Sequence, residues 1–222
     1  MKKRKNIIKI AIDSPAAAGA GTLAKALSKH YNLLTVDTGK IYRLIALYKI
    51  LNPKNFDKKT LKNKIHNLKI RDLNNKELLS DKIGTLASIL AKKKFIRQIV
   101  HDFQLNCAYN PPKKYSGSCL DGRDITYKII PDADFKFFIT ANVNTRARRR
   151  YNELLSLKKK ITYKEVLKSI KKRDKSDYNR KISPLKKTED SVLINTTNLS
   201  KRACFLKIKK IIDRKLKFNG NI

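Results

Sequence analysis

Residues 7–22 read IIKIAIDSPAAAGAGT, and this stretch decides how the chain folds. Ile7 to Ile12 form a short apolar run that ends at an Asp-Ser-Pro sequence, which is typical of a strand buried on both faces. A loop of small residues follows, and Leu23 to Tyr31 then repeats apolar side chains at helical spacing. The stretch therefore predicts a strand, a tight loop and a helix in direct succession.

The same alternation of strands and helices continues along the chain. Further strands are predicted at Leu33–Val36, Ser118–Leu120, Phe135–Thr140 and Val192–Ile194. Further helices are predicted at Tyr42–Leu51, Thr85–Ala91, Phe95–Ala108, Thr145–Leu157, Tyr163–Lys172 and Lys201–Leu216. Residues 54–81 are rich in Lys, Asn and Asp with only weak alternation, so we expect a small excursion from the core there. This order predicts an α/β fold: a parallel sheet with helices on both faces.

Composition favours a folded, non-membrane protein of the cytoplasm. The 222 residues are 41% hydrophobic, and no apolar run is long enough to span a membrane. Residues 1–20 resemble a secretion signal in their basic start, but Lys9 and Asp13 interrupt the apolar part, so a strand is predicted instead. Three scattered cysteines lack the paired spacing of a disulfide framework or a zinc site, which fits a reducing compartment and predicts no metal-binding side chains.

The formal charge of +35 is extreme and indicates an anionic ligand without identifying it. The basic residues run through every segment and are mostly lysine, mixed with isoleucine and asparagine. No stripe of basic and aromatic residues stands out, so compositional drift is favoured over a nucleic-acid surface.

The loop after the first predicted strand lies where a phosphate-binding loop would lie. Its residues are Ser14, Pro15, Ala16, Ala17, Ala18, Gly19, Ala20, Gly21 and Thr22. Backbone N–H groups at a helix start favour an anion, and small residues let the backbone approach it closely. Against the pattern G-x-x-x-x-G-K-[ST], however, Ser14 replaces a glycine and Ala20 replaces the lysine, although Thr22 keeps the hydroxyl. Taken alone, the loop fits an alanine-rich tight turn equally well.

Three further motifs follow in the chain. They are DTGKIYR at residues 37–43, DGRD at residues 121–124, and R-D-x-x-D-x-x-R at residues 173–180. Each alone is explained by a turn or by a solvated helix face with ion pairs. Together with the loop, in this order and at the ends of strands or on helices, they make the chain resemble the bacterial cytidylate kinases from about Ile7 to Leu216.

The resemblance implies a fold and an activity. The fold is that of the phosphate-loop nucleoside-monophosphate kinases, as one domain with its core at 1–52 and 115–222, an NMP-binding insertion at about 53–114 and a lid at about 157–182. The activity is transfer of the γ-phosphate of ATP, with Mg²⁺, to CMP or dCMP. Small-molecule substrates, a monomer and no dedicated nucleic-acid partner are expected.

The resemblance also implies roles for individual residues. Thr38 and the catalytic residues Arg43, Arg123 and Arg180 surround the acceptor phosphate, because guanidinium groups bind phosphate oxygens in pairs. The remaining substrate-binding residues are Asp37 at the start of its motif, Tyr42, Arg173 and Asp177 near the sugar, and Ser88, Arg97 and Asp124 at the base. A carboxylate accepts a hydrogen bond from the amino group of cytosine but faces a carbonyl oxygen in uracil, so Asp124 is the expected discriminator.

Several points stay open at this stage. Lys40 and Lys25 are the nearest candidates in sequence to replace the missing loop lysine. A helix trio, Arg146, Arg149 and Arg150, fits ATP binding and a solvated face equally well. Leu105 and Asn195 depart from the arginine and aspartate common in the family. The alternatives are a kinase acting on UMP, dTMP or AMP, and a non-catalytic nucleotide- or RNA-binding protein.

Overall fold

The computed structural model describes residues 7–218, so the outermost residues of the predicted core, 1–6 and 219–222, lie outside the described part. Its strands are β1 (Ile8–Asp13), β2 (Leu33–Asp37), β3 (Gly117–Gly122), β4 (Phe135–Thr140) and β5 (Val192–Asn195). Its α-helices are α1 (Ala20–Tyr31), α2 (Thr38–Leu51), α3 (Lys58–His66), α4 (Asp81–Leu90), α5 (Lys94–Tyr109), α6 (Val143–Ser156), α7 (Tyr163–Asn179) and α8 (Lys201–Phe218). No helix among the described residues is long and apolar enough to cross a membrane.

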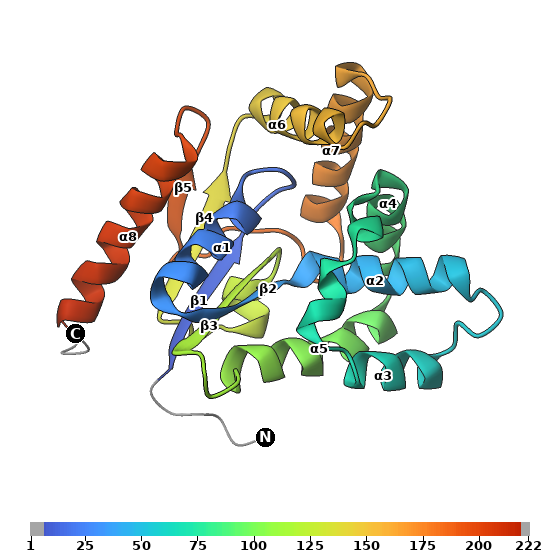
Figure 1. The fold of residues 1–222 in the computed structure, drawn as a ribbon, viewed down its shortest axis with the longest axis horizontal. Helices are drawn as coiled ribbons and strands as arrows, with labels where there is room; N and C mark the ends of the chain where they lie inside the picture. The colour runs from blue at the N-terminus through green and yellow to red at the C-terminus, as the bar shows by residue number, and fades with distance from the viewer. Residues whose placement is uncertain (1–6, 219–222) are drawn as a thin grey trace.

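The strands form one parallel sheet in the order β2-β3-β1-β4-β5, which confirms the predicted α/β class. Figure 1 shows α1 and α8 on one side of this sheet and α2 to α5 on the other. Alternate residues of β1 serve the two faces: Ile10 and Ile12 pack with α1 and α8, whereas Ala11 packs with the α2 side. The predicted burial of β1 on both faces is therefore confirmed.

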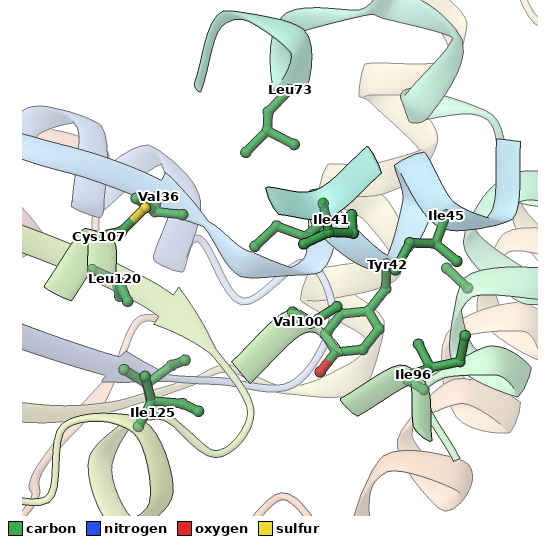
Figure 2. Packing of buried hydrophobic residues seen from close by; sticks show 14 of the residues in the cluster. Val36, Ile41, Tyr42, Ile45, Leu73, Ile96, Val100, Cys107, Leu120 and Ile125 are labelled. Atoms are coloured by element: carbon green, nitrogen blue, oxygen red, sulfur yellow. The ribbon is translucent and has the colours of Figure 1, made fainter. Parts of the chain in front are cut away.

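The larger apolar cluster joins the sheet to the α2–α5 side. Val36 and Leu120 of the sheet belong to it together with Ile41 and Ile45 of α2 and Ile96 of α5, all at most 1% exposed. Figure 2 shows Tyr42 among these side chains. This packing fixes the start of α2, and hence the residues around Tyr42, relative to the strand ends.

The expected excursion at residues 54–81 contains a helix that the sequence analysis did not predict, α3 at residues 58–66. Asp57 caps this helix by accepting a hydrogen bond from the Thr60 N–H at 2.9 Å. Leu61 and Ile65, four residues apart, are buried in the larger cluster. Nine residues give too short a window for the helical period to stand out among so many lysines. Two short 3₁₀ turns, Ile70–Asn74 and Lys76–Leu79, then lead to α4.

Helices α1 and α2 begin earlier than predicted, as do α4, α5 and α6, and the starts of α1 and α2 matter for the site. Helix α2 begins at Thr38, because the Asp37 carboxylate accepts from the Lys40 N–H at 3.3 Å and caps it. Helix α1 begins at Ala20, within the predicted loop, after Gly19 at φ 97°. The left-handed conformation at Gly19 suits a residue without a Cβ.

Candidate active site

The loop between β1 and α1 lines a central cavity of about 290 Å³. All nine predicted loop residues, Ser14 to Thr22, border it. No side chain caps the N-terminus of α1, whose first-turn backbone N–H groups lack helical acceptors. Ala17 at φ 59° and Gly19 at φ 97° adopt left-handed backbone conformations, which make the loop a tight turn. This geometry suits an anion at the helix start.

The central cavity adjoins two others through shared residues. A small cavity of about 50 Å³ shares Gly39, Gly122, Arg123 and Arg173 with it. An outer cavity of about 580 Å³ shares the loop from Ala17 to Gly19, Thr22 and Arg150. Three adjoining cavities therefore lie at the carboxyl ends of the strands, with the loop between the two larger ones.

The residues predicted to bind the base and the sugar line the small cavity. It is lined by Thr38, Tyr42, Ser88, Arg97, Asp124, Arg173, Asp177 and Arg180, together with Arg123. Arg97 donates to Asp124 at 2.8 Å, with both side chains less than 10% exposed. The Arg97 guanidinium also lies 5.6 Å from the centre of the Tyr42 ring. Charged groups of both signs are thus held in a desolvated slot that can pair with the edge of a base.

Asp177 gathers three arginines that come from different segments. Its carboxylate lies 2.8 Å from Arg123, 3.5 Å from Arg180 and 3.9 Å from Arg173. Burial alone would raise the pKa of Asp177, but the charges of Arg123 and Arg173 bring it below its ordinary value. One carboxylate facing three guanidinium groups leaves a net positive pocket, so the site is complementary to an anionic ligand.

Burial has a cost for the other two arginines, Arg173 and Arg180. Burial, followed by the charge of Arg123, lowers the pKa of Arg173 to about 10, which leaves it protonated at neutral pH. Arg180 has a buried Nη2 with no hydrogen-bond partner among the described residues. A buried guanidinium nitrogen without an acceptor costs free energy that a phosphate or hydroxyl oxygen would recover.

Arg43 reaches the central cavity from α2, where Gly84 makes room for it. Its guanidinium donates to the Ser80 carbonyl at 3.0 Å. A Cβ on Gly84 would lie 2.6 Å from the Arg43 Nη2, so only glycine at position 84 leaves this orientation open. Gly84 lies in the middle of α4, where glycine normally weakens a helix, and the sequence analysis missed its role.

Asp13 is a second residue that the sequence analysis missed. It is fully buried at the end of β1, and its carboxylate accepts from the Ile125 and Thr126 N–H groups at 2.9 Å each. Burial raises its pKa to about 6, and the bonds to Thr126 oppose that rise. Asp13 therefore ties the start of the phosphate loop to the turn that carries Asp124. Its place directly after a buried strand was the available signal.

The helix trio separates into different roles. Arg146 is buried and donates to the Ala16 carbonyl at 3.1 Å and, through both nitrogens, to Asp174. It thereby joins the phosphate loop to α7 and does not lie on a solvated face. Arg149 and Arg150 line the outer cavity, so the structure places these two, and not Arg146, within reach of a ligand there.

The amino-acid sequence matches known proteins over nearly its whole length. The family model "Cytidylate kinase" matches residues 10–214. A cytidylate kinase of Bartonella tribocorum is 42% identical over 95% of this chain and 96% of its own length. One from Fusobacterium nucleatum is 40% identical over 88% of this chain and 92% of its own. The chain belongs to the cytidylate kinase family.

A solved structure supports the fold alone. A crystal structure of an uncharacterized protein from Eubacterium ventriosum matches with a TM-score of 0.53 and 19% identity, over 93% of this chain and 98% of that one. Two positions at which the sequence analysis expected departures from the family pattern have plain structural surroundings. Asn195 accepts from both the backbone and the hydroxyl of Thr197, at 3.0 and 2.6 Å, and Leu105 packs against the larger apolar cluster.

Proposed function

We propose that this protein transfers the γ-phosphate of ATP to CMP or dCMP, giving ADP and CDP or dCDP. The observation that carries the proposal is the connection of the small cavity, with its arginines and Asp124, to the phosphate loop through Arg123 and Arg173. Membership of the cytidylate kinase family supports the same activity.

The acceptor phosphate binds between the two cavities, near Arg123. Arg43 and Arg123 border the central cavity, Arg180 borders the small one, and all three carry planar donors that suit phosphate oxygens. Thr38 is already held there, because its hydroxyl donates to the Asp121 carbonyl at 2.8 Å. An acceptor phosphate is ionised at neutral pH, so these groups need only bring two anions together and neutralise the charge that develops.

Asp177 and Tyr42 border the sugar in this proposal, and Arg97 and Asp124 read the base. Arg97 already occupies one oxygen of Asp124, which orients the carboxylate toward the cavity that Ser88 also lines. The cytosine amino group then donates to Asp124, whereas the uracil carbonyl would face the same carboxylate. Selection of cytosine over uracil follows from this one contact.

ATP binds with its phosphates at the loop, Ser14 to Thr22, and the remainder in the outer cavity beside Arg149 and Arg150. The site fits Mg²⁺ bound chiefly by phosphates and water, because Thr22 is exposed and borders the central cavity. The described residues contain no cluster of three or more His, Cys, Asp or Glu that would hold a metal alone. Mg²⁺ then supplies charge neutralisation at the phosphates.

The whole chain is proposed to act as a monomer in the cytoplasm, with a lid at about residues 157–182 and an NMP-binding insertion at about 53–114. α7, which carries Arg173 and Asp177, is part of the lid, and α4, which carries Gly84 and Ser88, is part of the insertion. No dedicated nucleic-acid partner is proposed, and the +35 charge is taken as compositional.

A coupled assay of ADP release tests the proposal. With Mg-ATP, we expect CMP and dCMP to stimulate ADP release well above UMP, AMP and dTMP. Stimulation by another monophosphate in place of CMP would move the protein to a different substrate. If no monophosphate stimulates release and RNA is bound in a strongly salt-dependent way, the chain is instead a non-catalytic binding protein.

A further inference from the structure

Position 20 of the phosphate loop lacks a cation, and we propose that Lys40, at the start of α2, supplies it to the phosphates of ATP. The inference rests on the proposed function and names a residue for its donor side. In this arrangement the positive charge comes from the neighbouring strand-helix unit and not from the loop itself.

The loop alone offers only backbone groups to an anion. None of its nine residues is basic, and Ala20 is 4% exposed, in the apolar cluster that also holds Ala18 and Leu23. Phosphoryl transfer from ATP builds charge on the donor phosphates, and losing one group that neutralises it typically costs about 10²–10³ in rate. A working enzyme therefore needs a cation from elsewhere.

The sheet brings Lys40 to the loop by way of Asp121. Asp37 of β2, three residues before Lys40, is paired in register with Asp121 of β3, next to β1 and the loop. The Asp121 Oδ2 lies 3.7 Å from where a Cβ on Gly21 would be, so this carboxylate faces the first turn of α1. Burial and the charge of Asp37 raise the pKa of Asp121, while Arg123 and Lys40 act against that rise. Lys40 and the helix start thus border the same carboxylate.

The Lys40 side chain is anchored at its base and free at its end. Its backbone N–H donates to the Asp37 carboxylate, which fixes its place in the first turn of α2. Between residues 7 and 218, no carboxylate lies within ion-pairing distance of its ammonium, and the side chain is only partly buried. The Asp121 Oδ1 is buried without a hydrogen-bond partner in the same range of residues. A flexible lysine stem suits a point charge that moves between this carboxylate and a phosphate.

The other basic residues near the loop are exposed, engaged or assigned to the acceptor side. Neither Lys25 nor Lys40 lines one of the three cavities, but Lys25 is exposed on α1, whereas Lys40 is partly buried and directly follows Gly39, which borders the central and the small cavity. Arg150 is paired with Asp81 and Glu153 at 2.8 and 2.9 Å. Arg149 donates to the Thr196 hydroxyl at 2.9 Å. Lys40 remains the cation best placed for the donor phosphates.

A charge-relocation experiment tests the assignment. Lys40→Met keeps the stem and removes the charge, and the double variant Ala20→Lys/Lys40→Met returns a lysine to the loop. We expect Lys40→Met to lower kcat/KM for ATP by about 100-fold while KM for CMP changes less than about threefold. The kcat/KM of the double variant for ATP should be at least about tenfold higher than that of Lys40→Met. Lys25→Met serves as the matched control and should behave as wild type.

Several outcomes would overturn the assignment. They are an activity of Lys40→Met within about threefold of wild type, a rise confined to KM for CMP, and a folded double variant that recovers nothing. Should the buried position 20 reject a lysine and the double variant fail to fold, Lys40→Arg replaces it and must retain more activity than Lys40→Met. Calorimetric ATP affinity of wild type and Lys40→Met separates the two proposals, because it decides the role of Lys40 even if wild type releases no ADP with any monophosphate.

Discussion

The acceptor side and the donor side of this site are built in different ways. Around Asp177, arginines from the turn after β3, from α7 and from the end of α7 lie within 4 Å of one buried carboxylate. The donor side is one tight loop of small residues whose binding groups are mainly its own backbone. Under the proposals above, the side-chain network selects the ligand, whereas the loop binds phosphate through backbone N–H groups and takes its cation from a neighbouring element.

The strongest test of this comparison removes Arg123, one of the two arginines that border both the central and the small cavity. Arg123→Ala should lower kcat/KM by about 10³-fold or more, because it removes a phosphate donor and leaves Asp177 with fewer partners. The coupled ADP assay measures the loss. Arg148→Ala, an exposed arginine of α6, is the control and should keep wild-type activity. Equal activity of the two variants would remove Arg123 from the mechanism.

A narrower change tests selectivity on the acceptor side. Asp124→Asn keeps the size of the side chain but allows it to donate toward a uracil carbonyl, so the preference for CMP over UMP should shrink by about 10–100-fold. The ratio of kcat/KM for the two nucleotides is the measurement. Unchanged selectivity in a folded variant would contradict the role of Asp124.

Gly84 tests whether the position of Arg43 matters, not merely its presence. Gly84→Ala puts a Cβ where the Arg43 guanidinium lies, and because that guanidinium is the end of a flexible side chain, it will be displaced. We expect a rise of about tenfold in KM for CMP with little change in KM for ATP. The neighbouring exposed residue provides the control, Thr85→Ala. A rise in KM for ATP alone would place Arg43 on the donor side.

The smallest expected effect lies in the donor loop. Ala17 adopts φ 59°, a conformation that costs an alanine more than a glycine, so Ala17→Gly should raise the free energy of unfolding by about 0.5 kcal/mol. Ala18→Gly, at a buried alanine outside that region, should lower it instead. Urea denaturation measures both. A loss of stability in both variants would show that Ala17 is not strained.

Local sequence patterns are enough to predict some strands and helices but not others. The strand from Phe135 to Thr140 was predicted with its observed bounds, since a short segment rich in aromatic and β-branched residues is typical of a buried strand. The early start of α2 was missed, because its cap is the side chain of Asp37, at the end of the preceding strand. Helix α3 was missed for the reason of length already given.

Some residues of the site could likewise be predicted from the sequence, and others could not. The motifs at 37–43, 121–124 and 173–180 identified the acceptor residues, and the structure brings them to one place, although their roles toward substrate stay predictions. Gly84 could not be found from the sequence, because its importance comes from the guanidinium of Arg43, which lies 41 residues earlier in the chain. The burial of Arg146 against Ala16 was equally hidden.

The sequence by itself determined the α/β class, the order of the elements and the family, because these follow from periodicity and from motifs a few residues long. Only the tertiary structure decided which charges meet. Parallel strands place their carboxyl ends along one edge, so the register of Asp37 with Asp121 brings Lys40 toward a loop eighteen residues away. Spacing in the sequence did not distinguish Lys25 from Lys40 as replacements for the lysine absent at position 20. The arrangement of the strands is what favours Lys40.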